Sequence, residues 1–359
     1  MKRLYCRITL LFLTVNLYNA LAQECAQAIR LARAIYDQGR LQEVETYLKP
    51  CFTGNSATDQ KTLLVEAYKL LCLSHIYLEE PEKADEDMLN IKRTDPYYRP
   101  NEGVDPAEYV ALYKTFRENP VFRYGARIGI NASRPNIRSL NTAVQLDEGS
   151  SVKQGLAFYF GLSADIPLKS RLTLHNNILF NPYRFNITEN VRVYDPLTDQ
   201  ERRNQFRGTE NQTWLTIGSQ AEYALFPTAS NFSQKLSPYV AGGGSLGYLL
   251  NADMTAERLR EGQSAVPEAN IDIYRTRMNV GLTAAAGIKP KVGTGKLVIE
   301  IRFTYGITPV NTQDKAYKNE RLLMDYYYAD PIFTMNSLSF SVAYMQDKFA
   351  PKKLTRSTK

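Results

Sequence analysis

The chain has 359 residues, with 44 basic and 37 acidic side chains and a formal net charge of +7. This mild basicity is not typical of a nucleic-acid-binding protein. Much of the excess lies in the segment 348–359, which we expect to be a solvated tail; attraction to anionic lipid or to an acidic partner is the alternative. After residue 22 the sequence contains no run of eighteen apolar residues, so no transmembrane helix is predicted.

The N-terminus has the features of a secretory signal peptide. Lys2, Arg3 and Arg7 form a positive region, an apolar stretch follows at 8–17, and a small-x-small cleavage site ends at residue 22. We therefore expect residues 1–22 to be removed, with an uncleaved anchor as the alternative.

Three cysteines then remain, an odd number for an oxidising compartment. Cys25 begins one expected helix and Cys51 follows another, so a disulfide between them would join an antiparallel helix pair. Cys72 lies in an apolar run and is expected to be an inert core thiol.

Residues 24–120 have an apolar period of about 3.6, which predicts helices. We expect five, and their limits are marked by Gly39, Pro50, the polar loop 53–59, the Asp95-Pro96 pair and the Asp105-Pro106 pair.

The second helix pair resembles a tetratricopeptide repeat, although Cys72 replaces the usual glycine and His75 the usual tyrosine. The residues at the aromatic, leucine, alanine, aromatic and proline positions of that family are Tyr68, Leu71, Ala84, Met88 and Pro96. A plain helical bundle is the alternative. A repeat array would imply a groove that binds a protein.

The stretch from Phe122 to Gln346 contains eight segments of alternating apolar and polar residues. The gaps between them are alternately long and short: 134–152, 167–170, 187–210, 227–236, 251–272, 289–295 and 309–334. This rhythm predicts an eight-stranded antiparallel outer-membrane barrel, with long loops outside and short turns in the periplasm. The sequence leaves open whether a loop segment adds a further hairpin.

The apolar face of each segment should contact lipid, and the other face should fill the barrel interior. The charged residues expected there are Arg123, Arg127, Asp165, Glu222, Arg275, Arg277, Glu300 and Arg302. We expect them to form a plug of salt bridges, with a narrow ion path as the alternative. Five arginines face three acids, so water or a loop residue must balance the remaining charge.

Three consecutive tyrosines, Tyr326, Tyr327 and Tyr328, lie in the last long gap. They are predicted to form an outer contact patch; the alternative is that they fold back onto the barrel rim.

The sequence shows little sign of catalysis. His75 is expected in a helix and His175 on the inward face of the third strand, and neither has the neighbours of a zinc site. A structural hydrogen-bonding role is expected for His175. The sequence predicts no cofactor, no metal site and no enzymatic activity.

The order of motifs resembles PorT-like outer-membrane β-barrel proteins. A signal precedes helices that end in Asp-Pro-Tyr-Tyr-x-Pro and Asp-Pro-x-Glu-Tyr, and the barrel opens with Phe122-x-x-Gly125-x-x-x-Gly129-x-Asn131. The resemblance implies a cell-envelope role, for some members in type IX secretion, and provides no catalytic residues.

The predicted chain is therefore an α+β multidomain protein: a signal peptide at 1–22, a periplasmic helical domain at 23–120, an eight-stranded outer-membrane barrel at 121–347 and a basic periplasmic tail at 348–359. We expect the barrel to contact outer-membrane lipid and the helical domain to recruit a periplasmic or outer-membrane protein, without nucleic acid. The alternatives are a small-solute or ion channel and an outer-surface receptor or adhesin that uses the long loops.

Overall fold

The computed structural model describes residues 24–52, 60–139, 151–195, 200–226, 236–259, 266–320, 322–323 and 328–354. The chain divides into two compact units. One is Val121–Lys348, and the other combines the residues up to Pro120 with those from Phe349 onward. The expected signal peptide lies outside the described residues.

The unit that contains the residues up to Pro120 is helical, as its apolar period predicts. Its helices are a helix at 24–37, α2 (Leu41–Phe52), α3 (Gln60–Tyr77), α4 (Pro81–Thr94) and α5 (Ala107–Lys114). Gly39 has a φ of 77°, the left-handed conformation that commonly follows a helix C-terminus. Among the described residues, no helix is long and apolar enough to cross a membrane.

The prediction that Pro50 stops the second helix is wrong, because α2 continues to Phe52. Cys51, in this last turn, is buried and is joined to Cys25 by a disulfide. This bond and the burial of Leu48 hold the turn in place although proline removes one helical hydrogen bond. The remaining cysteine, Cys72, is a buried free thiol.

The tail is not entirely solvated, contrary to expectation. Backbone N–H groups join it to the segment after α5: Arg117 donates to Lys352 at 3.0 Å and Leu354 donates to Thr115 at 2.8 Å. The ring of Phe349 also packs edge-on against Tyr97, with centroids 5.0 Å apart. Residues 349–354 thus pack onto the helical unit, where Phe116 and Lys353 form an isolated antiparallel β-bridge.

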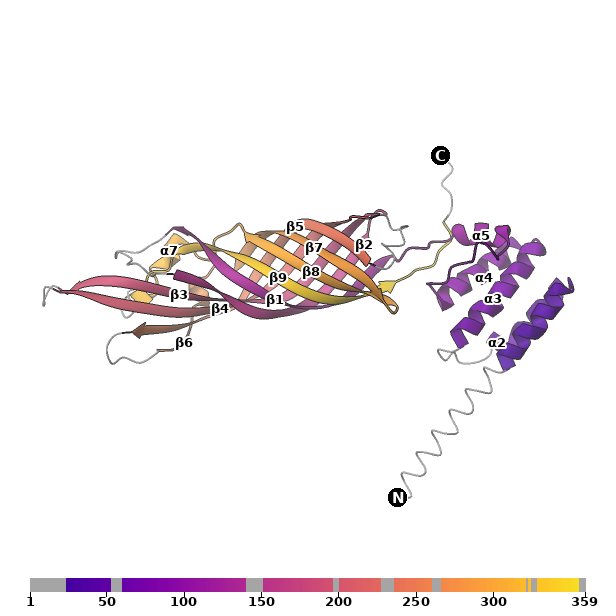
Figure 1. Ribbon diagram of the computed structural model, residues 1–359, viewed down its shortest axis with the longest axis horizontal. Helices are drawn as coiled ribbons and strands as arrows, with labels where there is room; N and C mark the ends of the chain where they lie inside the picture. The colour runs from indigo at the N-terminus through magenta and orange to yellow at the C-terminus, as the bar shows by residue number, and fades with distance from the viewer. Residues whose placement is uncertain are drawn as a thin grey trace, which may run out of the picture. The chain divides into compact units, whose positions relative to one another are not determined.

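The second unit is the barrel (Figure 1). Its strands are β1 (Phe122–Ser139), β2 (Ser151–Pro167), β3 (Leu172–Asp195), β4 (Gln200–Ala224), β5 (Leu236–Leu259), β6 (Val266–Asn270), β7 (Met278–Val292), β8 (Gly295–Gly306) and β9 (Ile332–Lys348). Eight of them, all but β6, pair antiparallel in a closed ring through the β1–β9 and β4–β5 pairings. The eight-stranded antiparallel barrel is therefore confirmed. The short strand β6 adds to β5, which is the extra hairpin that the sequence left open.

Several expected loops are strand. The segment 187–210 was predicted to be a loop, but β3 and β4 stay paired from Ile187↔Gly208 to Asp195↔Gln200. Figure 1 shows this hairpin projecting beyond most other strands, at the end of the barrel that carries β6 and the short helix α7 (Gln313–Ala316). We call this end the loop end and the opposite one, with the two-residue turn after Val292, the turn end.

The amphipathic pattern of the strands reverses along their length. Toward the turn end, large apolar side chains face outward and form an exposed belt, while polar residues face inward. Beyond the belt, inward positions become apolar and outward positions polar. In β3 the outward residues change from Ile178 and Phe180 to Arg184 and Asn186, and the inward ones from His175 and Asn177 to Phe185 and Ile187. The belt has the apolar outer face of a membrane-spanning barrel.

We call the part beyond the belt the head; its described strand residues include β1 from Arg134, β2 up to Gln154, β3 from Tyr183, β4 up to Trp214 and β5 from Leu249. The head has its own apolar core, to which the segment before β9 contributes Leu322 and Tyr328 and the start of β9 contributes Phe333. The polar outer face of the head explains why the sequence predicts loops there. Apolar and polar residues alternate in the head as they do in the belt, but the apolar ones face inward.

Candidate functional site

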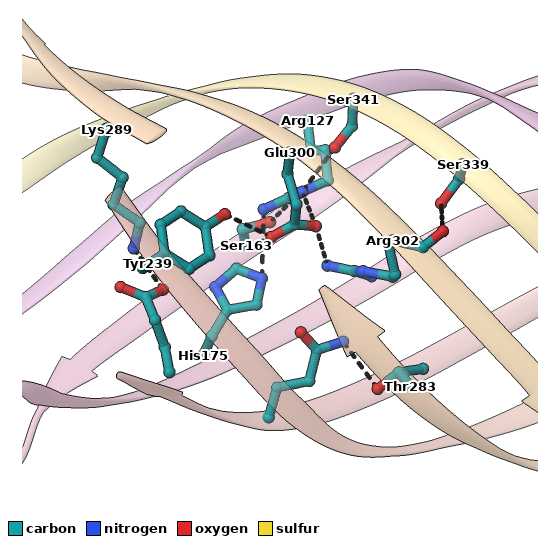
Figure 2. Close-up of polar contacts among 12 residues, drawn as sticks. Arg127, Ser163, His175, Tyr239, Thr283, Lys289, Glu300, Arg302, Ser339 and Ser341 are labelled. Carbon is teal, nitrogen blue, oxygen red and sulfur yellow. Dashed lines mark hydrogen bonds and ion pairs between the residues drawn. The ribbon is translucent and has the colours of Figure 1, made fainter. Parts of the chain in front are cut away.

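A network of charged and polar side chains fills the barrel within the belt (Figure 2). Arg127, which is 1% exposed, donates from Nη1 to Glu300 Oε1 and to Ser341 Oγ, each at 2.7 Å. Its Nε donates to Ser163 Oγ at 3.1 Å, and its Nη2 lies 3.3 Å from His175 Nε2. One guanidinium from β1 therefore connects β2, β3, β8 and β9 across the interior.

Glu300 accepts from two further groups. Arg302 Nη2 donates to its Oε1 at 2.7 Å and the Tyr239 hydroxyl donates to its Oε2 at 2.6 Å. These bonds stabilise the ionised carboxylate, which has been removed from water and needs such partners.

A second group of charges adjoins the first through His175. Its Nδ1 lies 2.5 Å from Asp165, and the Lys289 ammonium donates to Asp165 at 2.7 Å and to Glu222 at 2.6 Å. Asp165, His175 and Glu222 have ligand atoms close enough for one metal ion. The ammonium of Lys289 already supplies a positive charge to both carboxylates, so the arrangement is an internal ion cluster.

Little space remains inside. Among the described residues, two cavities along the interior have volumes of 30 and 20 Å³, which leaves room for one or two ordered waters in each. Glycines make room where strands approach closely: a Cβ on Gly243 would lie 2.1 Å from the Ser219 carbonyl oxygen. The side chains therefore form a plug.

Arg275 belongs to a different cluster, in the head. It is fully buried and bonds Glu210 through Nε and Nη2, both at 2.7 Å, and Asp330 through Nη1 at 2.7 Å. Asp330 comes from the segment before β9, so a loop residue balances part of the arginine excess. Gln212 and Trp214 extend the cluster along β4.

The remaining two arginines bond to acids other than Glu300, and only Arg123 has a largely buried side chain. Arg277 was expected inside, but its side chain is 46% exposed and pairs with Asp272, because β7 begins one residue later and leaves Arg277 at the rim. Arg123 pairs with Asp347 at 2.7 Å near the turn end.

The predicted tyrosine patch does not include Tyr328. This side chain is 1% exposed and its ring stacks on Phe206, with centroids 4.3 Å apart. The ring of Tyr328 is buried in the head core and not exposed in a solvated loop. For Tyr328 this is the predicted alternative, in which the tyrosines fold back. Tyr326 and Tyr327 lie outside the described residues.

The sequence-based prediction missed Lys289, Glu210 and Asp330. Continuing the inward alternation of β7 by every second residue reaches Lys289, but the predicted strand ended at Ile288. Glu210 has the inward parity of Glu222 on the same strand, yet it was assigned to a loop. The residues next to Asp330 in the sequence do not indicate that it joins the cluster, because its position depends on how the segment before β9 folds.

Comparisons with known proteins identify a family for the barrel. The family model described as outer membrane protein beta-barrel domain matches residues 117–311. No curated protein matches the chain.

Among solved structures, the attachment invasion locus protein Ail of Yersinia pestis is 11% identical; the match covers 63% of this chain and 99% of Ail, with a TM-score of 0.27. Neisserial surface protein A is 14% identical, with 63% and 97% covered and a TM-score of 0.29. For OprG from Pseudomonas aeruginosa the identity is 11%, the coverage 65% and 98%, and the TM-score 0.29. The family match covers more than half of the sequence, and the chain therefore belongs to the outer membrane protein beta-barrel domain family, whose members are located in the outer membrane.

Proposed function

We propose that the barrel is a closed membrane anchor and that the helical unit recruits a protein partner in a cell-envelope or secretion assembly. Type IX secretion is the assembly that the PorT-like resemblance implies. The observation that carries the proposal is the plug around Arg127 and Glu300. A barrel filled in this way holds attached parts of the chain in the membrane rather than passing solutes through it.

The way in which the chain enters and leaves the barrel supports a periplasmic location for the helical unit. The first residue of β1, Phe122, pairs with Lys348 at the end of β9, so both connections are at the turn end. Short turns of outer-membrane barrels face the periplasm. On this basis we assign the helical unit and the tail to the periplasm.

The helical unit has features of a binding domain. Leu71, Ala84 and Met88 are buried, as the tetratricopeptide pattern requires. By contrast, Tyr47 and Tyr77 are large side chains that remain 37% and 50% exposed. Exposed aromatic residues are enriched where proteins bind one another, which supports recruitment through Tyr47 and Tyr77.

The test is photo-cross-linking in whole cells with the full-length protein. A photoreactive phenylalanine replaces Tyr47 or Tyr77, and the matched control carries it at Glu82, an exposed position on α4. We expect both tyrosine positions, but not the control, to capture the same envelope protein. The full chain is needed because a fragment ending at residue 120 lacks the paired tail. Absence of any specific adduct from both positions contradicts recruitment.

The channel alternative is less well supported, since it needs a continuous path through the plug. Reconstituted protein should give no conductance steps in planar bilayers; discrete openings would instead favour a channel. We assign no catalytic role to the charged clusters, because their groups are bonded to one another inside the barrel.

A further inference from the structure

The wall of the head contains an unpaired seam between β1 and β2. The two strands are paired from Arg123↔Asp165 to Ser133↔Gly155. Beyond that point, residues 134–139 of β1 pair with β9, and residues 151–154 of β2 pair with β3. Within the described residues, no pairing joins these two edges, so each presents backbone groups without ladder partners.

A cavity of 670 Å³ lies at this seam, within the size range of small-molecule sites. It is lined by Arg134, Pro135, Asn136, Ile137, Ser151, Val152, Ile187, Thr188, Glu189 and Asn336. Ile137, Val152 and Ile187 provide an apolar wall, and the backbone carbonyls of the two edges are potential hydrogen-bond acceptors.

Glu189 is the acid that lines the cavity. It is 6% exposed and makes no hydrogen bond or ion pair with any other described residue. Burial, together with the negative charge of Asp330, raises the pKa of Glu189 to about 7. Glu189 lies in the head, beyond the apolar belt, and pairs with Phe206 of β4, an uncharged neighbour.

Among the described residues, the other titratable groups around Glu189 do not neutralise it. Asp330 is itself bonded to Arg275, and the Tyr328 hydroxyl is deeply buried near both acids. Arg134 lines the cavity from β1 but forms no ion pair with Glu189. The Glu189 side chain is largely buried and has no cationic partner among the described residues, which raises the free energy of its ionised form, and a cationic ligand would lower it.

We propose that this cavity binds a small organic cation, an ammonium group carried on an apolar body. The ammonium donates to the Glu189 carboxylate and to edge carbonyls, and the apolar body packs against Ile137, Val152 and Ile187. The three N–H donors of a primary ammonium group match the several acceptors around Glu189. This inference does not depend on the partner-recruiting function.

The test measures binding to the full-length protein in nanodiscs by titration calorimetry. Hexylamine is the cationic probe and hexanoate is its anionic match, with a similar apolar body. The variants are Glu189→Gln and, as control, Glu257→Gln, which changes an exposed acid on β5 of the same head. We expect saturable hexylamine binding to the wild type and to the control, and at least tenfold weaker binding to Glu189→Gln.

Proton release gives a second measurement at the same site. Because binding requires the ionised carboxylate, hexylamine should displace about half a proton at pH 7 from the wild type and none from Glu189→Gln. Titrations in buffers of different ionisation enthalpy measure this number. Equal affinity for Glu189→Gln, no saturable binding to the wild type, or tighter binding of hexanoate would each overturn the proposal. The last result would assign recognition to Arg134 instead.

Discussion

Arg275 donates hydrogen bonds to both carboxylate oxygens of Glu210, each at 2.7 Å, inside the head of the barrel. The same guanidinium bonds Asp330, which precedes β9, and its backbone carbonyl accepts from Lys315 at 2.9 Å. Arg275, in the segment before β7, therefore links the connection between β8 and β9 to β4. The fold of that connection is held by buried charges as well as by its apolar contacts.

Asp330→Asn should loosen the connection before β9. The substitution removes the charge that Arg275 bonds and leaves the guanidinium with a single carboxylate partner in a dry site. We expect faster cleavage by protease within residues 311–330, measured on the folded protein in detergent. Asp314→Asn, an exposed change in the same connection, is the control and should leave the rate unchanged. Equal rates for both variants would mean that the ion pair does not hold the connection.

Glu300→Gln should destabilise the barrel strongly. The change leaves Arg127 and Arg302 without their shared carboxylate, and breaking a buried ion pair typically costs about 3–5 kcal/mol. Urea unfolding in detergent, followed by the mobility of folded and unfolded protein on a gel, measures the loss. Glu257→Gln removes an exposed acid and should change the free energy of unfolding by less than about 0.5 kcal/mol. A loss as small as that for Glu300→Gln would show that the plug is dispensable for stability.

Glu189→Gln should stabilise the protein in the absence of ligand, in a pH-dependent way. The folded-state pKa of about 7 lies above the ordinary 4.5, so the folded protein binds a proton that the unfolded chain has lost between these values. Ionised Glu189 therefore destabilises the fold fully above pH 7, by about 3 kcal/mol, and not at all below pH 4.5. Unfolding measured at pH 8 and pH 4 should show a gain for the variant only at pH 8. An equal effect at both values would contradict a buried, unpartnered carboxyl.

Removing the tail from Phe349 onward should open the end of the helical unit. The Arg117 amide then loses its acceptor on Lys352, and Tyr97 loses an aromatic contact of the kind worth about 0.5–1.5 kcal/mol. Hydrogen exchange of the Arg117 amide should accelerate in this truncation. A shorter truncation after Leu354 keeps these contacts and provides the control. Unchanged exchange in the longer truncation would show that the tail is not part of the unit.

The strand register could be predicted wherever a strand crosses the belt, because lipid on one side and a polar interior on the other impose alternation. Arg127, Glu300 and Arg302 were placed inside for this reason. The same rule failed beyond the belt. Outward Thr188 of β3 and Arg207 of β4 resemble loop residues when lipid is assumed outside, although their strands continue.

The tyrosine run shows a second limit. Tyr328 and its neighbours give no local sign of their direction, and the stacking of Tyr328 on Phe206 joins segments more than a hundred residues apart. The same applies to Asp330, whose partner lies on another element.

By itself, the sequence determined the antiparallel eight-stranded barrel, the inward orientation of Arg127, Glu300 and Arg302, and the helices before it, because periods of two and about 3.6 report which side of an element is apolar. The tertiary structure decided which charges meet, that Lys289 and Asp330 complete the clusters, that the tail belongs to the helical unit, and that Glu189 faces a cavity. Those relationships arise when distant strands and connections come together, and residue spacing along a single chain does not encode them.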